Sequence, residues 1–134
     1  MNRKNFIEQA AYTARRAYQF SMKSRKRDID ELWDDIDADA IKRNDIFEIG
    51  MRLALESADS EDIDGILTGM ISREQDDMAK RLKIIQKEAV MCIHKKFNSF
   101  ELLNILFSYI DNDEKKAVRG LLTEDAFKNY FELY

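Results

Sequence analysis

The sequence contains no proline and only four glycines, the two residue types that most often interrupt helices and mark turns. Few interruptions predict long helices. Apolar residues make up 45% of the chain and charged residues 36%, a balance typical of amphipathic helices with solvated outer faces rather than of a disordered chain. We therefore predict an all-α fold, a helical bundle built around one long central helix.

Cysteine and histidine occur once each, as Cys92 and His94. A single cysteine permits no intramolecular disulfide, which suits a reducing compartment and predicts a cytoplasmic location. Two residues apart on a helix, the two side chains point to different faces, so neither a catalytic dyad nor a four-ligand zinc site follows. We expect Cys92 in the core and His94 at the surface near a helix C-terminus. The sequence thus predicts no enzyme activity, no metal site and no cofactor.

No apolar run approaches the ~20 residues needed to cross a bilayer, and the first residues resemble no export signal. The net charge of -4 and the pI near 5.1 argue against nucleic acid as the main partner. A length of 134 residues is typical of one domain with its own core. We predict a single domain, residues 1–134, without a membrane span.

Apolar residues at steps of three and four predict helices over most of the chain. The first extends from about residue 3 to residue 22, and a short one follows within 28–39. Asn44 or Asp45 is expected to cap a helix that ends near Glu56. Ser99 is expected to cap another, which ends at residues 111–113, and Thr123 to cap the last.

The longest apolar pattern extends from Ser60 to Asn98 and allows two interpretations. A helix can contain Gly65 and Gly69, each of which lowers its stability by about 1 kcal/mol relative to alanine. The polar stretch 72–77 contains no proline or glycine that would force the chain to change direction. We favour one continuous helix of about 50 Å over a hairpin. Such a helix would overhang a small domain and predicts a homodimer that exchanges its C-terminal half.

The stretch that begins at Ser60 partly matches a calcium-binding loop, with Asp62, Asp64 and Gly65 at suitable positions. The closing position holds Ile71, which cannot coordinate a hard cation. We interpret the acidic residues as a helix start stabilised by the helix dipole.

Six basic residues concentrate near the end of the first helix: Arg15, Arg16, Lys23, Arg25, Lys26 and Arg27. In an otherwise acidic protein this basic region predicts either a patch that docks on a protein partner or a solvated helix end. The sequence leaves both interpretations open.

Three segments, in order, resemble the cytoplasmic part of the MotA/PomA-type stator subunit of the bacterial flagellar motor, a family related to TolQ and ExbB. Ala14-Arg15-Arg16 and Phe20-Ser21-Met22 are similar to the start of its large cytoplasmic loop. Residues 44–74 resemble the rest of that loop, so the resemblance covers most of residues 1–74. Residues 88–110 are similar to the tail that follows the family's last membrane helix.

The chain departs from the family in ways that bear on function. The last two membrane helices are absent, so the resemblance implies no ion channel. The arginine through which the family contacts its rotor matches Arg15, whereas Lys23 occupies the place of the glutamate and reverses its charge. Both family prolines are missing. The resemblance implies a non-channel, cytoplasmic interaction module whose partner belongs to the flagellar motor. The alternatives are a helical adaptor or regulator unrelated to motility and, less favoured, a small all-helical enzyme.

Overall fold

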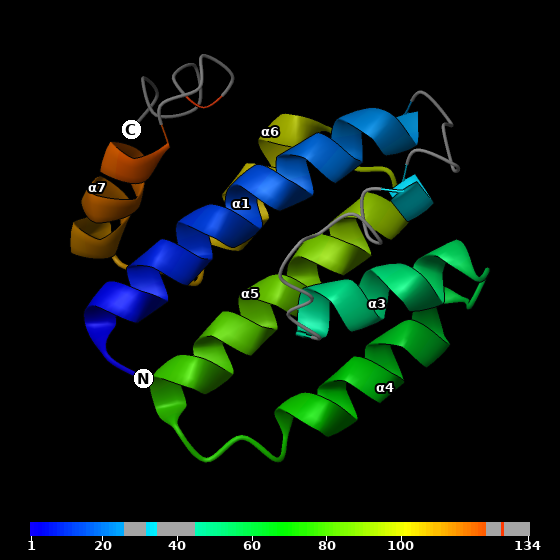
Figure 1. Cartoon of the computed structure of the whole chain (residues 1–134), viewed down its shortest axis with the longest axis horizontal. Helices are drawn as coiled ribbons and strands as arrows, with labels where there is room; N and C mark the ends of the chain where they lie inside the picture. Colours follow the sequence, from blue (N-terminus) through cyan, green and yellow to red (C-terminus); the bar gives the residue numbers. More distant parts are fainter. Residues whose placement is uncertain (26–31, 35–44, 123–126, 128–134) are drawn as a thin grey trace.

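The structure is a computed structural model that describes residues 1–25, 32–34, 45–122 and 127. Every regular element in these ranges is helical, as the sequence predicted (Figure 1). The elements in chain order are α1 (Arg3–Arg25), α3 (Ile46–Leu55), α4 (Ser60–Ile71), α5 (Asp77–His94), α6 (Ser99–Phe107) and α7 (Asn112–Leu121). Residues 32–34 are also helical. The rest of the predicted helix within 28–39 and the cap at Thr123 lie outside the described residues.

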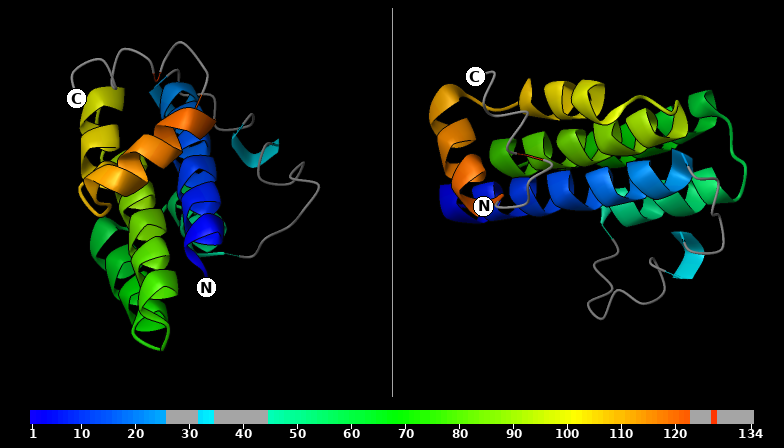
Figure 2. Two further views of the ribbon diagram at one scale, coloured as in Figure 1. Left: turned by 90° about the vertical axis from the view of Figure 1, so that its left-hand side faces the viewer. Right: turned by 90° about the horizontal axis from the view of Figure 1, so that it is seen from above.

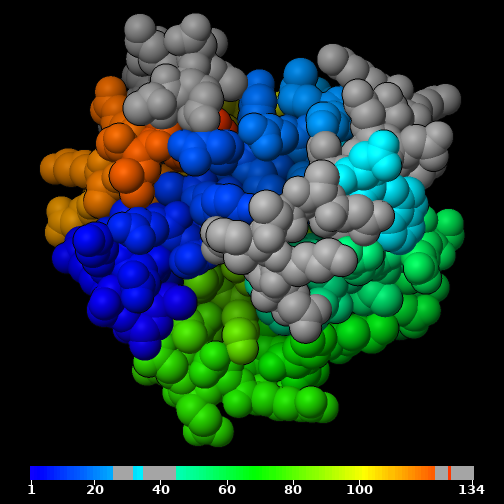
Figure 3. All heavy atoms as spheres, viewed as in Figure 1, coloured from blue at the N-terminus to red at the C-terminus, as the bar shows by residue number. Residues whose placement is uncertain are grey.

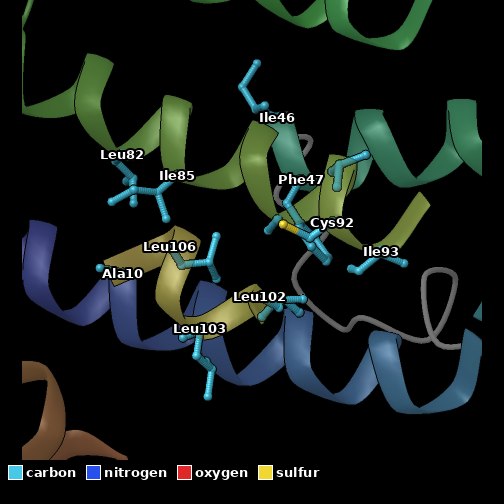
Figure 4. Packing of buried hydrophobic residues seen from close by; sticks show 14 of the residues in the cluster. Ala10, Ile46, Phe47, Leu82, Ile85, Cys92, Ile93, Leu102, Leu103 and Leu106 are labelled. Carbon is cyan, nitrogen blue, oxygen red and sulfur yellow. The ribbon is translucent and has the colours of Figure 1, made fainter. Parts of the chain in front are cut away.

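Helix α5 occupies the centre of the bundle and contacts α1, α3, α4 and α6 (Figures 1 and 2). Its apolar residues recur on more than one face, which allows it to pack against several helices at once. The buried side chains of α5 are Leu82, Ile85, Gln86, Ala89, Val90, Met91, Cys92 and Ile93. Figure 4 shows Leu82 and Ile85 among residues of α1 and α6. The prediction that Cys92 is a core residue is confirmed, since only 2% of it is exposed.

Helix α1 packs against α5 through a face of mostly small residues. Ala10, Ala14 and Ala17 follow Phe6 at helical spacing, and each is at most 3% exposed. Alanine combines the best helix propensity with a short side chain, so α1 remains helical while the two backbones approach closely. The steps of three and four residues that predicted the first helix therefore match its buried face at these positions.

The prediction of one continuous helix from Ser60 to Asn98 is wrong. The chain turns back between α4 and α5, and the two helices pack antiparallel (Figure 1). Asp76 caps α5 by accepting a 2.7 Å hydrogen bond from the backbone N–H of Ala79. Glu74 Oε2 accepts hydrogen bonds from the N–H groups of Gln75 and Asp76.

The hairpin forms because it buries the apolar face of α4. Ile63, Leu67 and Ile71 are each at most 5% exposed where α4 packs against α5 and α3. Burying each such side chain stabilises the fold by about 1.5 to 3 kcal/mol. The helix propensity of the polar residues 72–77, which would favour a continuous helix, is worth far less. The homodimer predicted from an overhanging continuous helix therefore loses its basis.

The C-terminal part of the fold departs from the predicted boundaries. Asn98, rather than Ser99, caps α6, in a reciprocal pair with Glu101. Asp111 lies where a helix was predicted to end, but its side chain also caps α7 through the N–H of Glu114. Helix α7, which packs across α1, is not among the helices predicted from the sequence (Figure 2).

Candidate functional site

The four basic residues of this region that the structure describes do not share one exposed surface. Lys26 and Arg27 lie outside the described residues. Lys23 is half-buried and Arg25 is exposed, both in the last turn of α1. Arg15 and Arg16 lie more than one turn earlier and have structural contacts.

Arg16 is buried, with 7% of the residue exposed. Its guanidinium carbon lies 4.9 Å from the ring centre of Phe47 and within 6 Å of the rings of Tyr12 and Phe20. Its Nη1 lies 4.0 Å from Oδ1 of Asp45, the residue that caps α3. Cation–π contacts of a desolvated arginine contribute about 2 kcal/mol. Arg16 thus joins α1 to the start of α3, and its predicted place in an exposed docking patch is wrong.

Arg15 is half-buried and donates a 2.8 Å hydrogen bond to the carbonyl oxygen of Leu121. That carbonyl belongs to the last residue of α7, where unpaired carbonyl groups attract a cation. Arg15 therefore holds α7 against α1.

A pocket of about 340 Å³ opens where α1, α3 and α5 end. These three ends lie on the same side of the molecule (Figure 1). The pocket is lined by Ser24, Leu32, Met51, Ala54, Leu55, Ser57, Ile93, His94 and Lys96. Its walls are mainly apolar, so it suits an apolar side chain or a small organic group.

Lys96 is a cation among the residues that line this pocket, and further cations are next to lining residues in the sequence. Lys23 and Arg25 flank Ser24, and the exposed Lys95 precedes Lys96 but lines a separate hollow with Glu61, Asp64 and Glu88. Glu56, at the end of α3, is a nearby anion and offsets part of this charge. We call the pocket together with Lys23, Arg25, Lys95 and Lys96 the basic pocket. Lys95 and Lys96 could not be assigned to this site from the sequence, because they are about 70 residues from the end of α1 in the chain.

Two helix ends at the pocket have the same unusual backbone. Ser57 and Lys96 adopt positive φ angles of 69° and 59°. Ala58 N–H donates to Leu53 and Ser57 N–H to Ala54, the two hydrogen bonds of a Schellman motif, and α5 ends in the same way. Glycine usually occupies the left-handed position, so both residues are strained.

His94 connects the end of α5 to the turn between α3 and α4. Its Nε2 lies 3.0 Å from the carbonyl oxygen of Ala58, which can only accept, so Nε2 carries a proton. Its Nδ1 lies 3.4 Å from the hydroxyl oxygen of Ser60. The prediction that His94 lies near a helix C-terminus is confirmed, because it is the last residue of α5, but its side chain is half-buried rather than at the surface.

The single cysteine and the single histidine, two residue types that often serve in catalysis, are held in structural contacts. Burial raises the pKa of the Cys92 thiol to about 12, so the thiolate nucleophile is scarce near neutral pH. Both ring nitrogens of His94 are engaged in contacts that brace the fold. No group of three possible metal-ligating side chains occurs among the described residues.

The predicted acidic helix start is confirmed. The stretch that partly matched a calcium-binding loop is the helix α4, with Glu61 and Asp62 in its first turn and Asp59 as its cap. None of the described helices combines the length and apolar character required to cross a bilayer.

No protein-family model, curated protein or solved structure matches the chain.

Proposed function

We propose that this chain is a non-catalytic protein-interaction module that binds an acidic segment of a partner protein in the basic pocket. The observation that carries the proposal is a mainly apolar cavity lined by Lys96, with further cations next to its lining residues in two distant parts of the sequence. An apolar side chain of the partner would fill the cavity, and carboxylates beside it would pair with Lys95, Lys96 and Arg25. Each exposed pair adds about 0.2 to 1 kcal/mol, so the cavity supplies affinity while the charges favour acidic partners.

A narrower proposal concerns the identity of the partner. We propose that the module is cytoplasmic and non-channel, related to the flagellar stator subunit, with a partner in the flagellar motor. The antiparallel packing of α4 and α5 supports the resemblance, because a membrane hairpin between the corresponding stator segments would make them antiparallel. The contacts of Arg15 weigh against a stator-like rotor contact, since this side chain binds Leu121 of its own chain. The alternative remains a helical adaptor unrelated to motility.

Peptide selection tests the basic pocket. A library of random peptides displayed on phage is panned against the wild-type chain and against the double variant Lys95→Gln, Lys96→Asn. Asparagine is chosen at residue 96 because it tolerates a positive φ. We expect the wild type to enrich acidic peptides with a large apolar residue, and the double variant to bind them at least about tenfold more weakly.

The chain offers a matched control in a second pair of adjacent lysines. Lys115 and Lys116 lie on α7, at the opposite side of the bundle (Figure 1). Lys115→Gln, Lys116→Gln removes the same charge and should leave peptide binding unchanged. Enrichment of basic peptides, or equal losses in the two double variants, would refute the basic pocket as a docking site.

The narrower proposal needs a defined partner. Purified rotor protein from the same bacterium, titrated against the chain by calorimetry, should bind the wild type and not the Lys95→Gln, Lys96→Asn variant. Absence of binding together with acidic peptide enrichment would favour the adaptor.

A further inference from the structure

The outer face of α4 is covered by no other helix of the described chain. Ile63, Leu67 and Ile71 face α5 and α3, which leaves the opposite face of α4 in solvent at the edge of the bundle (Figures 1 and 3). That face carries Ile66, which is 46% exposed, between Gly65 and Gly69. A large aliphatic side chain in the middle of an otherwise polar helix face suits a contact with another surface.

Packing within the described chain does not require glycine at residues 65 and 69. A Cβ atom added to Gly65 or Gly69 would meet no atom within 4 Å. Each glycine nevertheless costs the helix about 1 kcal/mol relative to alanine. A helix face without Cβ atoms allows a second backbone to approach closely, with Ile66 packed across it.

The charges at the two ends of this face determine which partner fits. Asp62 lies in the first turn of α4, and Arg73 follows its last turn. Both side chains are exposed, and neither takes part in an ion pair among the described residues. A parallel copy would place Asp62 against Asp62, whereas an antiparallel copy centred near residue 67 places Asp62 against Arg73. Twofold symmetry produces that pairing twice and brings Gly65 of one copy against Gly69 of the other.

We propose that two copies of this chain associate through the outer faces of their α4 helices, packed antiparallel about a twofold axis. The contact involves none of the residues of the basic pocket and so does not depend on the function proposed above. Helix α4 has 12 residues and is therefore about 18 Å long. One helix pair of this length buries less than the roughly 1,200 Å² typical of stable complexes, so we expect a weak, reversible dimer.

Sedimentation velocity tests the dimer on the full chain at concentrations from about 10 μM to about 1 mM, the range in which a weak interface dissociates. The informative variant is Gly65→Leu, which the monomer accommodates because the new side chain meets open space. We expect Gly65→Leu to raise the melting temperature, as leucine favours the helix, and to weaken association at least tenfold. A higher melting temperature together with weaker association would show that Gly65→Leu disrupts an interface, because a folding defect would lower the melting temperature.

Gly120→Leu provides the matched control, because Gly120 also lies in a helix, in α7, with open space at its Cβ position. It should leave association as in the wild type. Asp62→Arg should weaken the dimer, and the double variant Asp62→Arg, Arg73→Asp should restore it, with circular dichroism used to verify the helix content of each. A wild type that stays monomeric at the highest concentration, or a Gly65→Leu variant that associates like the wild type, would overturn the proposal.

Discussion

Arg81 of α5 and Glu114 of α7 form a bidentate ion pair, with Nη1 2.5 Å from Oε1 and Nη2 2.7 Å from Oε2. The guanidinium carbon of Arg81 lies 4.2 Å from the ring centre of Phe6 in α1, and Nη1 also donates to the carbonyl oxygen of Tyr109. Glu114 is 2% exposed and accepts a further hydrogen bond from the N–H of Asp111. One side chain of α5 therefore holds together α1, α7 and the turn between α6 and α7.

Replacing Arg81 with methionine should lower the free energy of unfolding by about 2 to 3 kcal/mol at pH 7, because it leaves a buried carboxylate without its cation. The expected loss is below that of a fully buried pair, since the side chain of Arg81 is 31% exposed. The hydrogen bond from Arg81 lowers the pKa of Glu114 from its ordinary value of 4.5, so the pair stabilises the fold above that pH. As the pH falls through the lowered pKa, Glu114 is protonated and the difference between wild type and variant should shrink.

Urea unfolding at pH 7 and at about pH 3 measures this difference. Lys83→Met is the control, because Lys83 is also on α5 and its ion pair with Glu74, at 3.0 Å, lies at the surface. Lys83→Met should lower the free energy of unfolding by less than about 1 kcal/mol. Equal losses in the two variants would show that the burial of Glu114 has no special effect.

Charge reversal at Arg16 should unfold the protein far more readily than the same change at its neighbour. Arg16→Glu would bury a carboxylate against aromatic rings and near Asp45, at a cost of more than about 3 kcal/mol. Arg15→Glu mainly loses one exposed hydrogen bond to Leu121, worth no more than about 1 kcal/mol. Thermal melting of the two variants under the same conditions compares them, and similar melting temperatures would contradict the structural role assigned to Arg16.

Gly50→Ala should destabilise the fold by about 1 to 3 kcal/mol, although alanine favours a helix. A Cβ atom at Gly50 would lie 2.7 Å from Cγ2 of Val90 and 3.0 Å from Cδ1 of Leu67, where α3 packs against α5 and α4. In a double-mutant cycle, Val90→Ala should recover part of the loss by removing the first clash. Additive effects of the two substitutions in chemical denaturation would show that the clash is absent.

Ser57→Gly should stabilise the protein by about 0.5 to 1 kcal/mol, because glycine adopts the left-handed conformation at the end of α3 without strain. The comparison is Ser72→Gly, at the end of α4. Ser72 has an ordinary helical φ of -60°, and its hydroxyl group donates to the carbonyl oxygen of Gly69. That variant should be destabilised. A gain in melting temperature for both variants would refute strain as the cause.

The positions of several helices follow from local chemistry that can be recognised in the sequence. Asp45 caps α3 whatever surrounds it, since the capping hydrogen bond joins residues three apart. The small, inward-facing residues of α1 and the apolar character of Cys92 were likewise visible as periodicity and residue type. The basic pocket was predicted only in part, because Lys23 and Arg25 are near each other in sequence whereas folding brings Lys96 to the pocket beside Ser24.

By itself, the sequence determined that the chain is helical, because helix propensity, apolar spacing and capping act within a few residues of one another. Only the tertiary structure decided that the chain reverses between α4 and α5, since residues 72–77 allow either geometry and the burial of Ile63, Leu67 and Ile71 favours the hairpin. The same holds for the basic residues. Arg16 has the charge of a surface residue, but Phe47 and Asp45 lie about 30 residues further along the chain, and packing brings them around its guanidinium group.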